Sequence, residues 1–226
     1  MTTPADGGHE VRDPELPGRL LRIERDALIP LLRGRADEDF ARPAAACPGW
    51  TARDVLAHCS AALTRVVENR FEKDVFSPEA NERDIAERAD WTNARVVDEL
   101  ERGMTEAGPV IAGAGGALDG LALGEWVHAG DVREAFGEPG AYAGAGLPYA
   151  LDLLAWITRE RGLVPVHADL DDRDEPLRLG EASGSRPPAR FIGAGPTLVR
   201  LYAGRPAAGA VYELAGVEAR ELNLYG

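Results

Sequence analysis

The chain has 226 residues, of which 45% are hydrophobic and 28% charged, a balance typical of a globular protein that can bury a sizeable core. Its formal net charge of −13 argues against nucleic acid as a partner, because a phosphate backbone requires a basic surface. No run of about 18 apolar residues is present, and the polar start lacks the layout of a secretory signal, so we expect a cytoplasmic protein without a membrane partner.

The first 140 residues are predicted to form a tail followed by a helical bundle. Residues 1–17 are polar and contain Pro and Gly, which predicts a disordered tail. Hydrophobic periodicity and capping signals then predict a bundle of four helices. We expect these helices over residues 18–33, 52 to about 71, about 84 to 107 and about 118 to 136.

The second predicted helix carries a histidine close to its apolar stripe. The turn Cys47-Pro48-Gly49-Trp50 precedes the helix, Thr51 is its predicted N-cap, and Asp54 stands in the capping-box position. His58 lies two turns further on and is predicted to point at the bundle interior or its edge. A lone histidine there is most often a hydrogen-bonded core residue, so a second signal is needed to suggest a ligand.

A strongly charged stretch, residues 72–90, leads into the third predicted helix. The ordinary interpretation is a solvated loop. The functional alternative is a lid over a site, from which Asn81 or Arg83 could touch a bound cofactor or substrate.

The fourth predicted helix supplies that second signal. Glu125 and His128 are three residues apart and therefore share one helical face, and Glu-x-x-His is a known way for a bundle helix to present two metal ligands. Charge on an otherwise apolar face is costly unless it is paired or bound to a metal. With His58, the pair predicts a metal site of two histidines and one carboxylate; the alternative is a buried Glu125–His128 pair without metal. Asp131 could join the ligands or orient the ring of His128.

Three protein ligands leave positions open, which is typical of a catalytic rather than a structural zinc site. A divalent ion in such a site ionises a bound water or thiol near neutral pH. Neither Cys47 nor Cys59 is well placed to be that thiol, and both are expected to be small buried side chains. A small-molecule thiol would therefore have to supply the sulfur. A serine hydrolase is not indicated, since GxSxG is absent.

Beyond residue 140 the pattern changes to one helix followed by short apolar or alternating runs between Gly-, Pro- or Asp-rich turns, which predicts a small antiparallel sheet. Helices are expected over 147–160 and 196–203, and strands over 163–168, 177–179, 189–192, 210–214 and 221–225. The predicted class is α+β. The predicted domains are the tail 1–17, the bundle 18–140 and a C-terminal α/β domain 141–226.

Three segments, Cys47–His58, Glu125–Arg133 and Leu198–Arg205, together resemble the mycothiol-dependent maleylpyruvate isomerase family, within the larger DinB/YfiT-like group of metal-binding four-helix proteins. They occur in the family's order and span nearly the whole chain. The resemblance implies a DinB-like bundle, a divalent metal, usually zinc, and mycothiol as the thiol cofactor. It implies an isomerase or S-transferase that acts on a small electrophilic substrate.

The resemblance carries His58 and His128 over as metal ligands and Arg205 as the residue that binds a substrate carboxylate, a task that suits a guanidinium. The family commonly places a glutamate four residues before the second histidine, where this chain has Gly124. Either the helix shifts so that Glu125 binds, or Asp131 substitutes, or the metal is weak or absent. In the last case the protein would bind a small ligand or a partner without chemistry.

Overall fold

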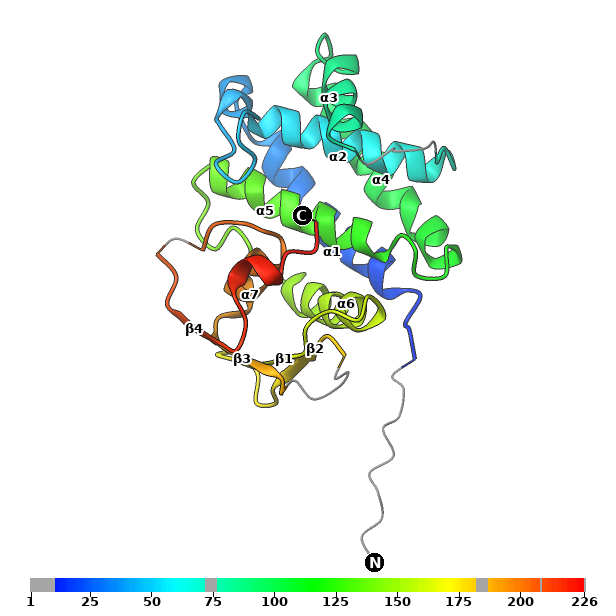
Figure 1. The fold of residues 1–226 in the computed structure, drawn as a ribbon. Coiled ribbons are helices and arrows are strands. Elements are labelled where there is room, and N and C mark those ends of the chain that lie inside the picture. The colour runs from blue at the N-terminus through cyan, green and yellow to red at the C-terminus, as the bar shows by residue number, and fades with distance from the viewer. Residues whose placement is uncertain (1–10, 72–76, 182–186, 208, 226) are drawn as a thin grey trace, which may run out of the picture.

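The computed structural model describes residues 11–71, 77–181, 187–207 and 209–225 (Figure 1). Its α-helices are α1 (Leu16–Arg33), α2 (Ala52–Val67), α3 (Pro78–Glu87), α4 (Asn93–Gly113), α5 (Asp119–Ala135), α6 (Leu147–Glu160) and α7 (Gly195–Tyr202). Its strands are β1 (Val166–Leu170), β2 (Leu177–Leu179), β3 (Ala189–Gly193) and β4 (Tyr212–Ala215), and two 3-10 helices are η1 (Asp37–Ala41) and η2 (Ala219–Glu221).

Helices α1, α2, α4 and α5 pack against one another as a four-helix bundle, and α3 lies against α2. Each bundle helix buries an apolar face, as its periodicity predicts. Fully buried side chains from the four helices meet in the core: Leu20, Leu63, Leu100 and Trp126. The predicted α+β class with an N-terminal helical part is confirmed.

The start of α2 follows directly from local sequence. The Thr51 hydroxyl accepts a hydrogen bond from the Asp54 backbone N–H, and the Asp54 carboxylate accepts one from the Thr51 N–H, so the predicted capping box is present. At the other end of the bundle, α1 begins at Leu16, and residues 1–10 of the predicted tail lie outside the described residues.

The prediction of one helix over about 84–107, preceded by a loop, is wrong. Ser77 caps α3 and Thr92 caps α4, and each hydroxyl accepts a hydrogen bond from a backbone N–H three residues later. The ion pair of Arg65 with the fully buried Asp84 fastens α3 to α2. This tertiary contact, together with two caps, explains why a highly charged stretch is helical. Residues 72–76 lie outside the described part.

The sheet has the order β2-β1-β3-β4 and is mixed, so the prediction of a purely antiparallel sheet is wrong in one pairing. β1 pairs antiparallel with β2 along one edge and parallel with β3 along the other. The predicted strand over 221–225 is also absent. There the chain leaves the sheet, and the Leu224 N–H donates to the Tyr202 carbonyl at the end of α7.

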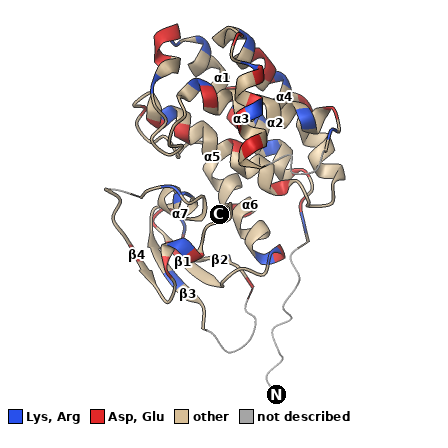
Figure 2. Cartoon of the chain, turned by 45° about the horizontal axis from the view of Figure 1, so that its top comes forward, with Lys and Arg blue, Asp and Glu red and all other residues tan. Residues whose placement is uncertain are grey.

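Helix α6 joins the two parts of the molecule. It packs against α1 and α5 of the bundle and against β2 and α7 of the C-terminal part, and Figure 1 shows it between the bundle and the sheet. The boundary between residues 140 and 141 stays a prediction. Acidic and basic residues are interspersed over the helices (Figure 2). Within the described chain, no helix has both the length and the apolar character that crossing a membrane requires.

Candidate functional site

A cavity of about 660 Å³ opens between α2 and α5 and brings together most of the predicted site residues. The turn before α2, helix α3, the end of α6 and the C-terminal segment complete its wall. Predicted site residues that line it are His58, Asn81, Glu125, His128 and Arg205. Residues that were not predicted but also line it include Cys47, Trp50, Arg161 and Tyr225.

The two histidines from α2 and α5 face each other across this cavity. The ring centroids of His58 and His128 are 5.4 Å apart in an edge-to-face arrangement. The centroid of the Trp50 ring, which the tight turn before α2 holds in place, lies 5.3 Å from that of His58. Two residues separated by 70 positions in the sequence are thus neighbours, as the predicted bundle requires.

Asp131, one turn after His128, orients the imidazole. Its Oδ2 is 2.9 Å from His128 Nδ1, and Arg205 donates to the same carboxylate from Nη2 (2.8 Å) and Nε (3.1 Å). Burial would raise the pKa of Asp131, but the hydrogen bonds from His128 and Arg205 lower it below its ordinary value, so the carboxylate stays ionised. With Nδ1 bonded to Asp131, His128 keeps Nε2 for a ligand.

Tyr142 is a third residue on this carboxylate, and no pattern in the sequence indicated it. Its hydroxyl lies 2.5 Å from Asp131 Oδ1. The ring reaches this position because it packs on Gly130, where an added Cβ would lie no more than 2.9 Å from three ring atoms. A glycine in the middle of α5 is therefore explained by a side chain that holds Asp131.

Cys47 also contacts Asp131, contrary to the expectation of a purely packed side chain. Its Sγ is 3.4 Å from Asp131 Oδ2, and burial together with Asp131 raises the pKa of Cys47 to about 12, so it remains a thiol. Donor atoms of Cys47, His128 and Asp131 lie within 4.8 Å of one another, close enough for a metal site. However, Arg205 Nη2 lies within 3.7 Å of these three donor atoms, so a guanidinium already contacts the groups that a metal ion would need.

Three residues of the cavity wall have a buried polar atom without a hydrogen-bond partner among the described residues. The atoms are Nδ1 of His58, Oε2 of Glu125 and Oδ1 of Asn81. Burial and the neighbouring His128 lower the pKa of His58 to about 3, so its ring is neutral at physiological pH. Burial raises the pKa of Glu125 to about 8, an effect that the nearby Cys59 partly offsets. Glu125 is not in the three-donor cluster above, and the trio of His58, Glu125 and His128 stays a prediction.

The predicted cofactor-binding residues both lie on α3 but differ in position. Asn81 lines the cavity, and its Oδ1 is buried without a partner in the described chain. Arg83 is exposed and is not among the described residues that line the cavity. Both roles remain predictions.

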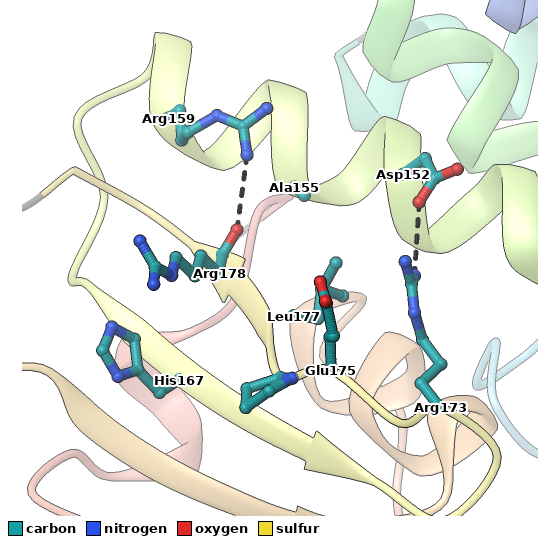
Figure 3. A pocket seen from close by; sticks show the side chains of 9 residues that line it. Asp152, Ala155, Arg159, His167, Arg173, Glu175, Leu177 and Arg178 are labelled. Atoms are coloured by element: carbon teal, nitrogen blue, oxygen red, sulfur yellow. Dashed lines mark hydrogen bonds and ion pairs between the residues drawn. The ribbon is translucent and has the colours of Figure 1, made fainter. Parts of the chain in front are cut away.

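A second hollow of about 550 Å³ lies between α6 and the strands β1 and β2 (Figure 3). Arg173 there pairs with Asp152 of α6, and Arg159 donates to the Arg178 carbonyl. None of its described lining side chains has a buried polar atom without a partner, and no predicted site residue reaches it. We assign it no function.

Known proteins share this architecture. No curated protein matches the chain. Two solved structures do, of a mycothiol-dependent maleylpyruvate isomerase and of a mutant of it in which alanine replaces a histidine, with TM-scores of 0.52 and 0.53. Each is 19% identical, and each alignment covers 89% of this chain and 93% of the other, which shows a common fold. Residues 21–130 match the family described as the mycothiol maleylpyruvate isomerase N-terminal domain. Since this match includes the helices with His58 and His128, the helical bundle of the chain belongs to the mycothiol maleylpyruvate isomerase N-terminal domain family.

Proposed function

We propose that the protein is a metal- and mycothiol-dependent isomerase or S-transferase that acts on a small, electrophilic, anionic substrate. The observation that carries the proposal is the pair of facing imidazoles in the cavity wall, one of which has its Nδ1 bonded to a buried carboxylate. A histidine backed by a carboxylate is the usual arrangement for a metal-binding imidazole.

The side chains around the cavity fit a divalent cation. Two imidazoles that bind one tetrahedral zinc ion have centroids roughly 5 Å apart, given Zn–N bonds of about 2 Å. The 5.4 Å between His58 and His128 is close to that spacing. The unpartnered atoms of His58 and Glu125 gain a partner if these residues bind the ion, because a buried polar atom without one is costly. A cation held by His58, Glu125 and His128 would supply the Lewis acidity that ionises a thiol.

The chain's own residues divide the remaining tasks. Asp131 fixes the His128 ring, and Arg205 keeps Asp131 ionised and adds positive charge beside the cavity. Cys47 cannot replace the external thiol as a nucleophile, since its pKa of about 12 leaves it protonated. Asn81, with an unpartnered amide oxygen at the cavity wall, is suited to accept a hydrogen bond from a hydroxyl or amide of the thiol cofactor.

A second candidate is a metal-free protein that binds a small ligand or a partner. Two observations favour it: Gly124 stands where the family commonly has a glutamate, and Glu125 is buried with a pKa raised to about 8. A neutral Glu125 carboxyl group would be a poor metal ligand.

Metal content separates the two candidates. Protein purified without chelator should contain about one equivalent of zinc or another divalent ion by elemental analysis, and His128→Ala should lose it. Asp131→Asn should weaken zinc affinity by about 10- to 100-fold in a competition titration, because it removes the group that orients His128. The matched control is His167→Ala, an exposed histidine on β1 outside the cavity.

A sub-stoichiometric metal content that His128→Ala does not change would contradict the metal-dependent mechanism and favour the second candidate. Thermal unfolding gives an independent readout, since a bound ion raises the melting temperature and EDTA then lowers it. The thiol requirement is tested by assaying isomerisation of maleylpyruvate with and without mycothiol.

A further inference from the structure

Two glycines leave one turn of the cavity-facing side of helix α5 without side chains. Gly120 and Gly124 are four residues apart and therefore stacked along the helix. A Cβ at Gly120 would lie 3.0 Å from Arg161 Nη2, and one at Gly124 would lie 3.7 Å from the Tyr225 hydroxyl. These two side chains therefore occupy the space that larger residues on α5 would fill.

The C-terminal segment is anchored so that Tyr225 is held in this gap. Leu222 is 1% exposed, and the backbone of Leu224 is bonded at both ends: its N–H donates to Tyr202 O (2.8 Å) and its carbonyl accepts from Arg161 Nη1 (3.1 Å). The Tyr225 hydroxyl donates to the Gly120 carbonyl (3.1 Å). Arg161 and Tyr225 consequently line the cavity as one unit.

Arg205, the residue expected to bind a substrate carboxylate, is already engaged. Its Nε and Nη2 both donate to Asp131, and its Nη1 donates to the Ala203 carbonyl. Arg161, by contrast, donates to Leu224 alone among the described residues, which leaves most of its N–H groups available. Asp131 balances the charge of Arg205, so Arg161 supplies the uncompensated positive charge of the described cavity wall, whose single carboxyl group is that of Glu125.

We propose that Arg161 and Tyr225 form the anion-binding end of the cavity and hold a carboxylate of the substrate. The guanidinium supplies charge-assisted hydrogen bonds, and the phenol adds one by turning from the Gly120 carbonyl toward the ligand. That carbonyl belongs to α5 and retains its intrahelical acceptor role, so the turn leaves no backbone group without a partner. A side chain at Gly120 would crowd the Arg161 guanidinium, which lies 3.0 Å from an added Cβ, whereas a methyl group at Gly124 would only touch the Tyr225 ring.

This inference rests on the proposed function for the identity of the ligand, but it can be tested without turnover. The probe is maleate, a small dicarboxylate, titrated calorimetrically into the full chain in EDTA so that no metal contributes. The neutral dimethyl ester of maleate serves as the uncharged comparison. We expect Arg161→Gln to weaken maleate binding about tenfold or more, and Tyr225→Phe severalfold. Arg161→Lys should recover part of the loss, which excludes misfolding as the cause.

The matched control is Arg159→Gln, which removes an arginine two residues away whose guanidinium lies in the second hollow (Figure 3). It should bind maleate like the wild type. Binding of maleate that is equal in the wild type and Arg161→Gln, or no binding at all, overturns the inference. If thiol-dependent turnover is absent while maleate binding depends on Arg161, the proposed function fails and this inference stands. If turnover is present and Arg161→Gln leaves KM unchanged, the proposed function stands and this inference fails.

Discussion

At the scale of single residues, one buried carboxylate connects four separate parts of the chain. Asp131 of α5 contacts Cys47 in the turn before α2 and His128 on α5 itself. It also contacts Tyr142 in the connection before α6 and Arg205 just after α7. Because the carboxylate is ionised and paired with a guanidinium, the cluster is close to electrically neutral, and removal of either partner would leave a buried charge unpaired.

The buried carboxyl group of Glu125 has no guanidinium paired with it among the described residues. We therefore expect the stability of the fold to depend on the ionisation of Glu125 and so on pH. The folded state holds its proton up to about pH 8, whereas the unfolded chain releases it near the ordinary pKa of 4.5. Between these values the folded state binds more protons than the unfolded state, so the free energy of unfolding falls as pH rises. In EDTA, Glu125→Gln should remove this slope, which amounts to about 1 kcal/mol per pH unit.

Urea denaturation of both proteins at several pH values between 5 and 8 measures the effect. The stability of Glu125→Gln relative to the wild type should increase steadily across that range. Glu106→Gln, on the exposed face of α4, is the control and should leave the slope of the wild type intact. Parallel pH profiles for Glu125→Gln and the wild type would mean that Glu125 ionises normally in the fold.

The sequence predicts some of these residues and not others for a physical reason. His58, Glu125 and His128 stand on helices whose faces follow from 3.6-residue periodicity, so their approach to one cavity could be predicted. Cys47, Tyr142 and Tyr225 stand on turns or near the end of the chain, where position depends on tertiary packing. The glycines of α5 that lie against Tyr142 and Tyr225 can be read from the sequence only as residues of low helix propensity, because the side chains that pack on them are not known.

At the scale of helices and strands, local signals located some boundaries well. The capping box at Thr51 places the start of α2, and the predicted helix over 147–160 coincides with α6. The prediction failed where two helices follow each other closely. The N-caps Ser77 and Thr92 begin α3 and α4, where a single helix was predicted. The parallel pairing of β1 with β3 could not be predicted, because strand order is decided by packing and not by alternation.

At the level of helix α5, the close contact between Gly130 and Tyr142 predicts the effect of an alanine substitution on stability. Replacement with alanine normally stabilises a helix, but here the added Cβ would collide with the Tyr142 ring. The ring must move and loses its bond to Asp131, so Gly130→Ala should destabilise the protein by about 1–3 kcal/mol and weaken metal binding as Asp131→Asn does.

Gly113→Ala is the matched control, since a Cβ at the end of α4 meets nothing within 4 Å. It should leave the melting temperature unchanged or raise it slightly. Calorimetry of the two variants gives the comparison. A Gly130→Ala protein as stable as Gly113→Ala would show that the Tyr142 ring shifts without cost.

At the scale of the whole molecule, two connections hold the bundle and the sheet together. Helix α6 packs on both, and the C-terminal segment returns from the sheet to α5 through Arg161, Leu224 and Tyr225. The cavity lies along this junction, so its wall depends on the relative position of both parts. The resemblance to solved structures extends over 89% of the chain, so this arrangement is common to the fold.

The junction predicts that the protein unfolds as one cooperative unit. Leu222, at the start of the returning segment, is 1% exposed, so Leu222→Ala should lower the free energy of unfolding by about 2–4 kcal/mol. Val211→Ala is the control, because that side chain is 93% exposed and should change stability little. Tryptophan fluorescence reports mainly on the bundle, since Trp126 is buried in its core and Trp156 of α6 is the one tryptophan beyond residue 140, and far-UV circular dichroism reports on all helices. Both signals should shift to the same lower urea midpoint in Leu222→Ala, since a segment that bridges the parts stabilises both. Two separate transitions, with the fluorescence midpoint unmoved, would mean that the bundle is stable without the C-terminal segment and that the cavity wall can open independently of it.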